Sequence, residues 1–312
     1  MVQMINRVAK VLKKSRLLFP RKRESSLSQQ QDPRFRGGSK RVALRSMFLI
    51  CLACLPVSPA LAENYAAKYD VYAGGIHALQ ARFDYQAGPK EYAVSIASET
   101  YGILSKIVPW HATLNTKGQV LKGKKLPISH KADTTTRKKH EINTYSYDKN
   151  GALVSFNQVV NGKDETLTDL DPAIYKDTMD VLTAIFSLID QVGVGKGCEA
   201  EPLVFDSERS YRLIFKNGKK EILVPNKYSS FSGEAIGCAF EVKPEGGKWH
   251  KKPRGWMKIQ NQAKKSGQMP IIYFANLSKT EKPVYAPVRT VIKTDLGTFI
   301  AHLTSFEEKP VK

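Results

Sequence analysis

The chain has 312 residues, of which 42% are hydrophobic, and a formal net charge of +20 from 49 Lys and Arg against 29 Asp and Glu. Residues 1–62 hold 13 of the basic residues and only two acidic ones, so residues 63–312 carry a net charge of +9. A charge of this size suits a protein that works near anionic envelope surfaces. It is no argument for a nucleic-acid partner, and we expect none.

An apolar run at residues 47–62 is the first strong signal along the chain. It ends in the small-x-small triplet Ala60-Leu-Ala62, just before Glu63, and basic residues stand directly upstream of it. The run is too short and too interrupted by proline to be a permanent transmembrane helix. We therefore predict a secretory signal peptide cleaved between Ala62 and Glu63. The protein would then be periplasmic, with outer-membrane association left open.

The regions before and after the apolar run complete the predicted domain organisation. About forty residues precede the apolar run, far more than the few of a usual n-region, so we interpret residues 1–46 as an extension outside the fold. Residues 63–312 contain no Ser, Gly or Pro-rich linker and are expected to form a single β-rich exported domain. The alternative to cleavage after Ala62 is lipidation of Cys51 or Cys54.

Most of residues 63–312 have the pattern of short strands. Segments rich in Tyr, Val, Ile, Thr and Phe alternate with polar residues and are separated by turn residues. The expected strands are Tyr65–Tyr72, Gly75–Gln86, Tyr92–Thr100, His111–Thr116, Val120–Leu126, Ile128–Thr135, Lys139–Tyr147, Leu153–Val160, Tyr211–Lys216, Lys220–Val224, Glu234–Val242, Ile271–Leu277, Val284–Thr294 and Gly297–Phe306.

Hairpin signals join several of these strands. They are Asn150-Gly151, Asn161-Gly162, Asn217-Gly218 and Asp295-Leu-Gly297. Sequential antiparallel pairing follows, and so many strands exceed what one flat sheet usually holds. The predicted fold class is mainly β: a curled antiparallel sheet, half-barrel or barrel-like, with one principal amphipathic helix.

That helix is predicted at residues 177–193, with Asp177 as its cap and Gly193 at its end. Its apolar residues recur at helical spacing: Met179, Leu182, Ile185, Phe186 and Ile189. Such a stripe packs on the sheet as a plug, or it covers a ligand cavity as a lid. We favour the plug and retain these five residues as candidate cavity residues.

Two cysteines remain after the predicted cleavage, Cys198 and Cys238. An even number in an oxidising compartment predicts a disulfide. The competing interpretation is a catalytic thiol, which would need a base that the neighbouring sequence does not supply.

The most distinctive surface candidate is the segment Lys248–Trp256, in which two tryptophans bracket basic residues. Amphipathic indole rings lie at the head-group level of a membrane while Lys and Arg meet phosphates. The candidate membrane or ligand contacts are Trp249, Lys251, Lys252, Arg254 and Trp256. The alternative is a solvated loop whose tryptophans pack against the sheet.

No catalytic motif is present in the sequence. It contains no nucleophile elbow, no zinc-protease motif and no Walker loop, and its six histidines lack metal-ligand spacing. We therefore predict no enzyme activity, no metal and no cofactor. Carboxylates gathered from separate strands would be invisible at this level, so a hydrolase of envelope polymers stays as an alternative.

Several segments of the chain resemble one known family. They are Tyr69-Asp-Val-Tyr-Ala-Gly-Gly-Ile76, the predicted helix from Asp177 to Asp190, Cys198, Val204-Phe-Asp206 with Tyr211, Ser232-Gly-Glu-Ala-Ile-Gly-Cys238, Pro287-Val-Arg289 and Thr294-Asp-Leu-Gly297. Over residues 65–306 the chain is similar to the exported bacterial family known as domain of unknown function 3108. It departs from that family at Ser207-Glu-Arg209 and at Lys243–Gly247.

The resemblance implies an envelope location and, by analogy, a half-barrel like that of periplasmic lipoprotein carriers. The leading hypothesis is a non-enzymatic periplasmic protein that binds an apolar or acylated envelope component. The partner is then a lipid, with peripheral membrane contact. The alternative is a structural or assembly factor whose partner is an envelope protein. The oligomeric state is not predicted.

Overall fold

A computed structural model describes residues 63–249, 256–279, 281, 283–294 and 297–309. The predicted extension at 1–46 and signal peptide at 47–62 lie outside these residues, as do Ala62, Lys251, Lys252 and Arg254. None of the helices in the described part of the chain is long and apolar enough to cross a bilayer.

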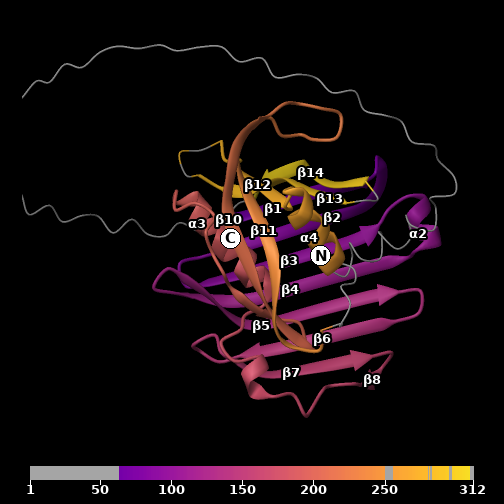
Figure 1. Cartoon of the computed structure of the whole chain (residues 1–312). Helices are drawn as coiled ribbons and strands as arrows, with labels where there is room; N and C mark the ends of the chain where they lie inside the picture. Colours follow the sequence, from indigo (N-terminus) through magenta and orange to yellow (C-terminus); the bar gives the residue numbers. More distant parts are fainter. Residues whose placement is uncertain (1–62, 250–255, 280, 282, 295–296, 310–312) are drawn as a thin grey trace, which may run out of the picture.

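The protein is mostly β, and its strands form one continuous antiparallel sheet (Figure 1). The first group of strands is β1 (Glu63–Ala73), β2 (Ile76–Ala87), β3 (Glu91–Thr100), β4 (Trp110–Leu121), β5 (Lys124–Thr136), β6 (His140–Tyr147), β7 (Leu153–Val160) and β8 (Lys163–Asp164). The second group is β9 (Leu203–Phe205), β10 (Arg209–Leu223), β11 (Gly233–Gly247), β12 (Ile271–Asn276), β13 (Tyr285–Thr294) and β14 (Gly297–Glu308).

The strand order places the two groups in series. It runs from β8 through to β1, then β14 through to β9, so the terminal strands β1 and β14 pair in the middle. The two outermost strands, β8 and β9, follow one another in the sequence. The segment between them contains a short 3-10 helix (Pro172–Ile174) and α3 (Val181–Gly193). Residues 165–202 therefore connect one outer edge of the sheet to the other.

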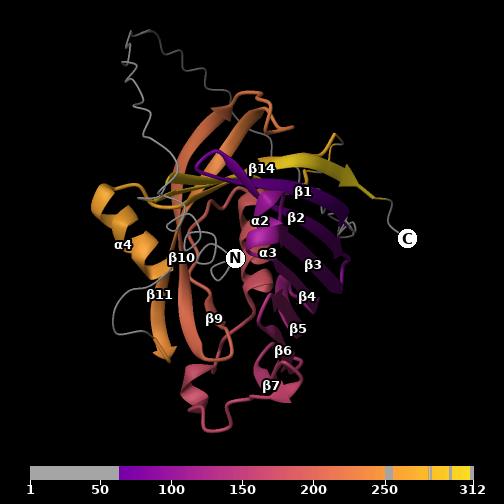
Figure 2. The ribbon, with the colours of Figure 1, turned by 90° about the vertical axis from the view of Figure 1, so that its right-hand side faces the viewer.

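The sheet is curved and α3 lies inside the curve (Figure 2). The β2–β5 wall stands on one side of α3, and the β10–β11 wall stands on the other. Strand alternation accounts for the lining of the first wall, because directly opposite residues share a face. Tyr85 pairs with Val94, Val94 with Thr116, and Thr116 with His130. These residues form one row across the concave face.

The sheet is not closed by hydrogen bonds, but aromatic side chains join its two ends. Phe205 of β9 contacts Phe156 of β7, with ring centroids 5.1 Å apart, and Tyr175, at 5.8 Å. The ring centroid of Tyr145, on β6, lies 6.2 Å from that of Phe205. The predicted half-barrel or barrel-like class is therefore confirmed as an open, strongly curved sheet.

Two shorter helices were not predicted. The helix α2 (Ile103–Ile107) connects β3 to β4. The helix α4 (Trp256–Ser266) lies beside β11, past the end of β12 (Figure 2). The side-chain amide of Gln260 replaces a neighbouring strand there: it donates to Val242 O at 2.9 Å and accepts from Val242 N at 2.6 Å.

Two predicted strand boundaries are wrong. The expected strand Val120–Leu126 instead spans the turn of the β4–β5 hairpin, where Lys122 and Gly123 both have positive φ. The expected break near Gly118 is absent, because Gly118 lies within β4 opposite Tyr92. A Cβ on Gly118 would lie 2.3 Å from the Tyr92 ring, so glycine here makes room for an aromatic side chain.

The predicted hairpin at Asn217-Gly218 is also wrong, since β10 continues through it with only a local irregularity in register. The Asn217 side chain accepts a hydrogen bond from Cys198 N at 2.7 Å, and Gly218 approaches the backbone of Gly237. Both residues therefore make tertiary contacts, Asn217 with the segment after α3 and Gly218 with β11. Asn161-Gly162 does form the predicted turn, with both residues at positive φ.

Candidate functional site

The apolar stripe of α3 is packed into the main core. Leu182, Phe186 and Ile189 are buried, whereas Ile185 is half-buried at the edge of the same cluster. The Phe186 ring is stacked on Tyr85 with the ring centroids 4.5 Å apart. The structure thus places these candidate cavity residues as a plug against the β2–β5 wall.

Asp180 begins α3, so the predicted cap at Asp177 is wrong. The Asp180 carboxylate accepts from Leu182 N and Thr183 N, each at 3.0 Å, and from the Thr183 hydroxyl at 2.5 Å. Asp177 stands before the helix at positive φ. Met179, the first residue of the predicted stripe, is also outside the helix, in a backbone bridge to Val204 of β9.

The same carboxylate ties the helix to the sheet. Thr116 of β4 donates to Asp180 at 2.8 Å, and His130 Nδ1 of β5 lies 3.4 Å from it. Burial lowers the pKa of His130, although the neighbouring Asp180 opposes that change. Because the Asp180 carboxylate accepts hydrogen bonds from both the helix and the sheet, we interpret its contact with the buried His130 as structural.

Further polar contacts hold α3 along its length. The Tyr92 hydroxyl of β3 is hydrogen-bonded to the Thr183 hydroxyl at 2.6 Å. Near the C-terminal end, Lys125 of β5 forms an ion pair with Asp190. The Lys125 side chain is buried, so this ion pair is shielded from solvent on the lysine side. The helix is thus anchored to the β2–β5 wall at both ends.

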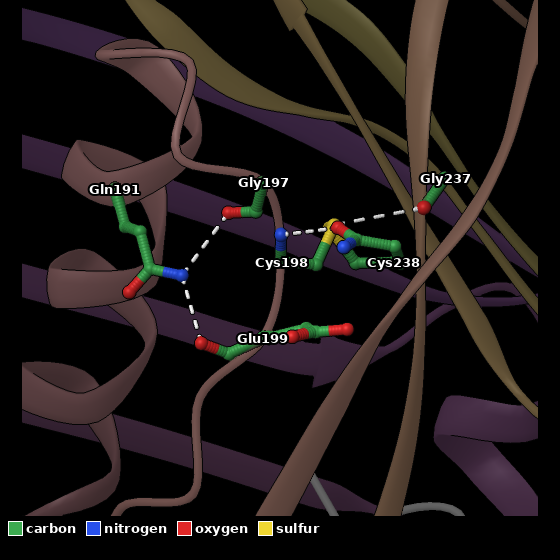
Figure 3. The surroundings of a disulfide bond; sticks show 7 residues. Gln191, Gly197, Cys198, Glu199, Gly237 and Cys238 are labelled. Atoms are coloured by element: carbon green, nitrogen blue, oxygen red, sulfur yellow. Dashed lines mark hydrogen bonds between the residues drawn. A yellow bond between two sulfur atoms is a disulfide. The ribbon is translucent and has the colours of Figure 1, made fainter.

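The disulfide ties the segment after α3 to the opposite wall. Cys198 and Cys238 form the predicted disulfide, with their Cα atoms 5.6 Å apart. Both residues are fully buried. Figure 3 shows Gln191, from the end of α3, donating to the carbonyls of Gly197 and Glu199 on either side of Cys198. The helix, its exit segment and β11 are therefore connected in one unit.

The two tryptophans of the predicted membrane-contact segment are not together on an exposed loop. Trp249 packs against Tyr211, and its indole nitrogen donates to Gly246 O at 2.8 Å. The Arg209 guanidinium lies 4.7 Å from the Trp249 ring centre. Trp256 is 2% exposed and is stacked on Phe240. We therefore withdraw Trp256 as a surface contact; the basic residues between lie outside the described part of the chain.

Asp206 is a charged site that the sequence analysis did not identify. It lies in the turn before β10, and Arg209 Nε is 3.1 Å from its Oδ2, whereas Oδ1 is buried without a hydrogen-bond partner in the described part of the chain. Burial raises the pKa of Asp206 to about 7, against the lowering effect of Arg209. Its position in the Val204-Phe-Asp206 motif was the only sequence signal.

A surface hollow lies beside α2, at the end of β3–β5. Its volume is about 260 Å³. The residues that line this α2 hollow are Glu99, Thr100, Ser105, Pro109, Trp110, His111, Thr135, Thr136 and Arg137. Arg137 is held by a 2.7 Å hydrogen bond from its guanidinium to Lys106 O. Trp110 is almost fully buried, and its indole N–H has no partner among the described residues.

The outer face of α2 is apolar and exposed. Leu104 anchors the helix in the core, but Ile103 and Ile107, four residues apart and so on one face, are 62% and 56% exposed. Sequence reasoning missed this site because a five-residue helix is too short to show helical periodicity. In the described part of the chain, no group of three or more His, Cys, Asp or Glu residues is arranged to hold a metal ion.

Comparison with known proteins gives a family and a distant structural likeness. A family model described as a protein of unknown function (DUF3108) matches residues 68–304. No curated protein matches the chain. A beta-barrel-like protein of domain of unknown function DUF1849 from Brucella abortus is similar to 80% of this chain over 98% of its own, with a TM-score of 0.40 and 13% identity. A likeness at this level carries no argument about function.

Proposed function

The chain belongs to the DUF3108 family, whose description assigns no activity, and from its geometry we propose a non-enzymatic cell-envelope protein that binds an apolar or acylated ligand beside α2. The observation that carries the proposal is the exposure of Ile103 and Ile107 on α2, the helix whose Ser105 lines the α2 hollow. Clustered apolar side chains in water mark binding sites more often than isolated ones do. An apolar ligand that extends from the hollow over α2 would cover both isoleucines.

The dimensions of the hollow limit what it would hold. Pockets for drug-sized ligands are about 300–1,000 Å³, and the α2 hollow, at about 260 Å³, is slightly smaller. It suits one acyl chain segment and not a whole lipid. Arg137 at the rim would meet an anionic head group, and the Trp110 ring would pack against the chain.

The envelope location rests on two observations of different kinds. The apolar run at residues 47–62 has the features of a signal peptide. The Cys198–Cys238 disulfide is a bond that persists in oxidising compartments such as the periplasm. With cleavage after Ala62, the mature chain would begin at Glu63, the first residue of β1.

The proposal is tested by titrating the purified protein with dodecanoate below its micellar concentration, using calorimetry. We expect binding by the wild type and a loss of at least about tenfold in affinity for the double variant Ile103→Ser, Ile107→Ser, because each isoleucine buried by a ligand contributes about 1.5–3 kcal/mol at full burial. Val154→Ser, a change at a similarly exposed residue of β7, should bind as the wild type does. No binding by the wild type, or equal loss in both variants, would contradict the proposal.

A structural or assembly role is the second candidate, and one observation favours it. The concave face, where a carrier of this shape would hold its cargo, is occupied by α3 and its packed side chains. On that view the interior stabilises the protein and the outer surface binds an envelope protein.

Photo-crosslinking from position 103 in intact cells distinguishes the two candidate functions: capture of lipid alone counts against the assembly role. Hydrolysis of peptidoglycan or lipid A by the wild type would overturn the non-enzymatic assignment.

A further inference from the structure

The two edges of the β10–β11 hairpin are covered along most of their length. On the β11 side, β12 pairs with Ile236–Ala239, and Gln260 of α4 satisfies the backbone of Val242. On the β10 side, β9 pairs with Ser210–Arg212. The backbone amides of Leu213 and Phe215 then donate to the carbonyls of Pro202 and Ala200. This coverage ends at Asn217, whose side chain meets Cys198 N.

Beyond that point β10 continues without a neighbour on its outer side. Residues Lys219–Leu223 are here named the distal β10 edge, and from Lys220 onwards they pair with β11 on the inner side only. No strand or backbone group in the described part of the chain pairs with the other side. About half of the N–H and C=O groups of an antiparallel strand point to each side, so this edge presents unpaired groups. Figure 1 shows the β10–β11 hairpin extending past the rest of the sheet.

The side chains of the distal β10 edge divide by face. Leu223 is buried in a second core cluster with Ala235 and Tyr273, which holds the strand in place. On the other face Ile222 is 79% exposed, and Val224, just after the strand, is 70% exposed. Lys220 shares that outward face, where its ammonium forms an exposed ion pair with Glu234 of β11 at 2.9 Å, and Lys219 is exposed beside it. Glu221, between Lys220 and Ile222, accepts a hydrogen bond from the Tyr273 hydroxyl at 2.7 Å. The edge therefore offers two apolar residues, then two lysines, along an ordered strand.

The unpaired backbone decides between classes of partner. A lipid surface would cover Ile222 and Val224 but would leave the backbone N–H and C=O groups of the edge without partners in a poorly hydrated region, at a cost of several kcal/mol for each buried group. A second copy of the chain would bury too little, because a five-residue strand falls short of the about 1,000 Å² that a stable dimer needs. An extended peptide satisfies the backbone and both side-chain types.

We propose that the distal β10 edge receives an extended segment of another protein by strand addition, with apolar residues opposite Ile222 and Val224 and acidic residues opposite Lys219 and Lys220. Backbone pairing would supply affinity, and the apolar-then-acidic order would supply specificity. This inference does not rest on the ligand proposed beside α2.

The test uses a fluorescently labelled peptide, Val-Thr-Ile-Thr-Glu-Glu, whose order matches Val224 back to Lys219 in an antiparallel pair. Fluorescence anisotropy is measured with the full mature protein. The control peptide, Glu-Thr-Glu-Thr-Val-Ile, has the same composition but places glutamates opposite the apolar residues. Two further peptides are N-methylated on one or the other alternating set of residues. Only one of these sets would point its amides at β10.

We expect the matched peptide to bind at least about tenfold more tightly than the control peptide, and one of the two N-methylated peptides to lose binding. Ile222→Thr should weaken binding by a similar factor, whereas Val154→Thr, at a residue 64% exposed on β7, should not. Circular dichroism of both variants checks that they are folded.

Three results would overturn the proposal. The first is absence of binding up to about 1 mM of the matched peptide. The second is equal binding by both N-methylated peptides, which would show a side-chain patch and not strand addition. The third is a self-association or a binding to phosphatidylglycerol vesicles that Ile222→Thr abolishes while the peptide stays unbound, which would assign the edge to a second copy or to lipid.

Discussion

Asp206 shows how a single residue in this protein acquires an unusual property. Its Oδ2 lies beside Arg209, yet its Oδ1 is buried without a hydrogen bond in the described part of the chain, and burial raises its pKa to about 7. Asp84 on β2 is the opposite case: the Arg82 side chain, assisted by Lys309, holds its pKa down at about 2. The environment, and not the residue type, therefore decides whether the pKa of an aspartate is raised or lowered.

These two residues predict opposite dependences of stability on pH. The folded state keeps the Asp206 proton up to about pH 7, whereas the unfolded state loses it near the ordinary value of 3.8. The folded state therefore binds more protons between these values, and Asp206 lowers the free energy of unfolding as pH rises through that window. We expect the effect of Asp206→Asn on the free energy of unfolding to be more favourable at pH 8 than at pH 4, by on the order of 2 kcal/mol.

Urea unfolding of the two proteins at pH 4, 6 and 8 measures this difference. Asp84→Asn is the matched control, because a lowered pKa contributes stability above about pH 4 that is lost as pH falls towards 2. Its destabilising effect should therefore be present at pH 6 and 8 alike. If Asp206→Asn changed stability equally at all three values, a proton held by Asp206 in the folded state would be excluded.

At the scale of elements, α3 is defined by tertiary contacts as much as by its own periodicity. Asp180 accepts two backbone bonds of the first turn, as a cap should, and also the hydroxyls of Thr183 and of Thr116 on β4. Asp177 has the same side chain three residues earlier and was the predicted cap. The contact with the sheet explains why Asp180 and not Asp177 is the cap, because only the Asp180 carboxylate accepts hydrogen bonds from both the helix and a strand.

Asp180→Ala should therefore cost far more than an ordinary cap. A surface cap contributes about 1 kcal/mol, whereas a buried carboxylate that satisfies several donors leaves each of them unpaired when it is removed, so we expect a loss of about 3–5 kcal/mol. Thermal and urea unfolding measure it. Asp171→Ala is the matched control, because Asp171 is an exposed cap with a single bond to Ala173 N. Similar losses in the two variants would show that the contact to Thr116 contributes nothing.

β10 and α4 show what local sequence patterns miss in elements. Asn217-Gly218 has the composition of a hairpin turn, but β10 passes through it because Asn217 is bonded to Cys198 N from another segment. The helix α4 has buried residues at 256, 259, 260 and 263, a helical spacing that was available in the sequence. It was missed because the Trp and Lys residues before it were interpreted as a surface loop.

The whole molecule depends on contacts that join its two walls. The aromatic cluster around Phe205 connects the two ends of the sheet, and α3 contacts the β2–β5 wall through Tyr85, Tyr92 and Lys125. The disulfide fastens the exit of α3 to β11 on the other wall. An open sheet with few such links would be free to flatten. We therefore interpret α3 and the segment that follows it, up to Cys198, as the elements that hold the sheet in its curved shape.

The double variant Cys198→Ser, Cys238→Ser tests that interpretation. Removing a cross-link across 40 residues lowers the free energy of unfolding by about 4 kcal/mol in the loop-entropy description. We expect that loss, and we expect hydrogen exchange to increase first in residues 194–217 and at the C-terminal end of α3. Reduction of the wild type with dithiothreitol should reproduce both effects. Faster exchange spread evenly over both walls would contradict this interpretation.

The sequence by itself determined the strand-rich character, most strand positions, the existence of a helix near residues 177–193 and the pairing of the only two cysteines in residues 63–312. These follow from period-2 alternation, helical spacing and composition, which act between neighbours in the chain. Only the tertiary structure decided that α3 fills the curve, that Asp180 caps it, that Trp256 is buried and that the distal β10 edge is left uncovered. Each of these depends on residues far apart in sequence, such as Thr116, Cys198 and Gln260, whose proximity no local pattern encodes.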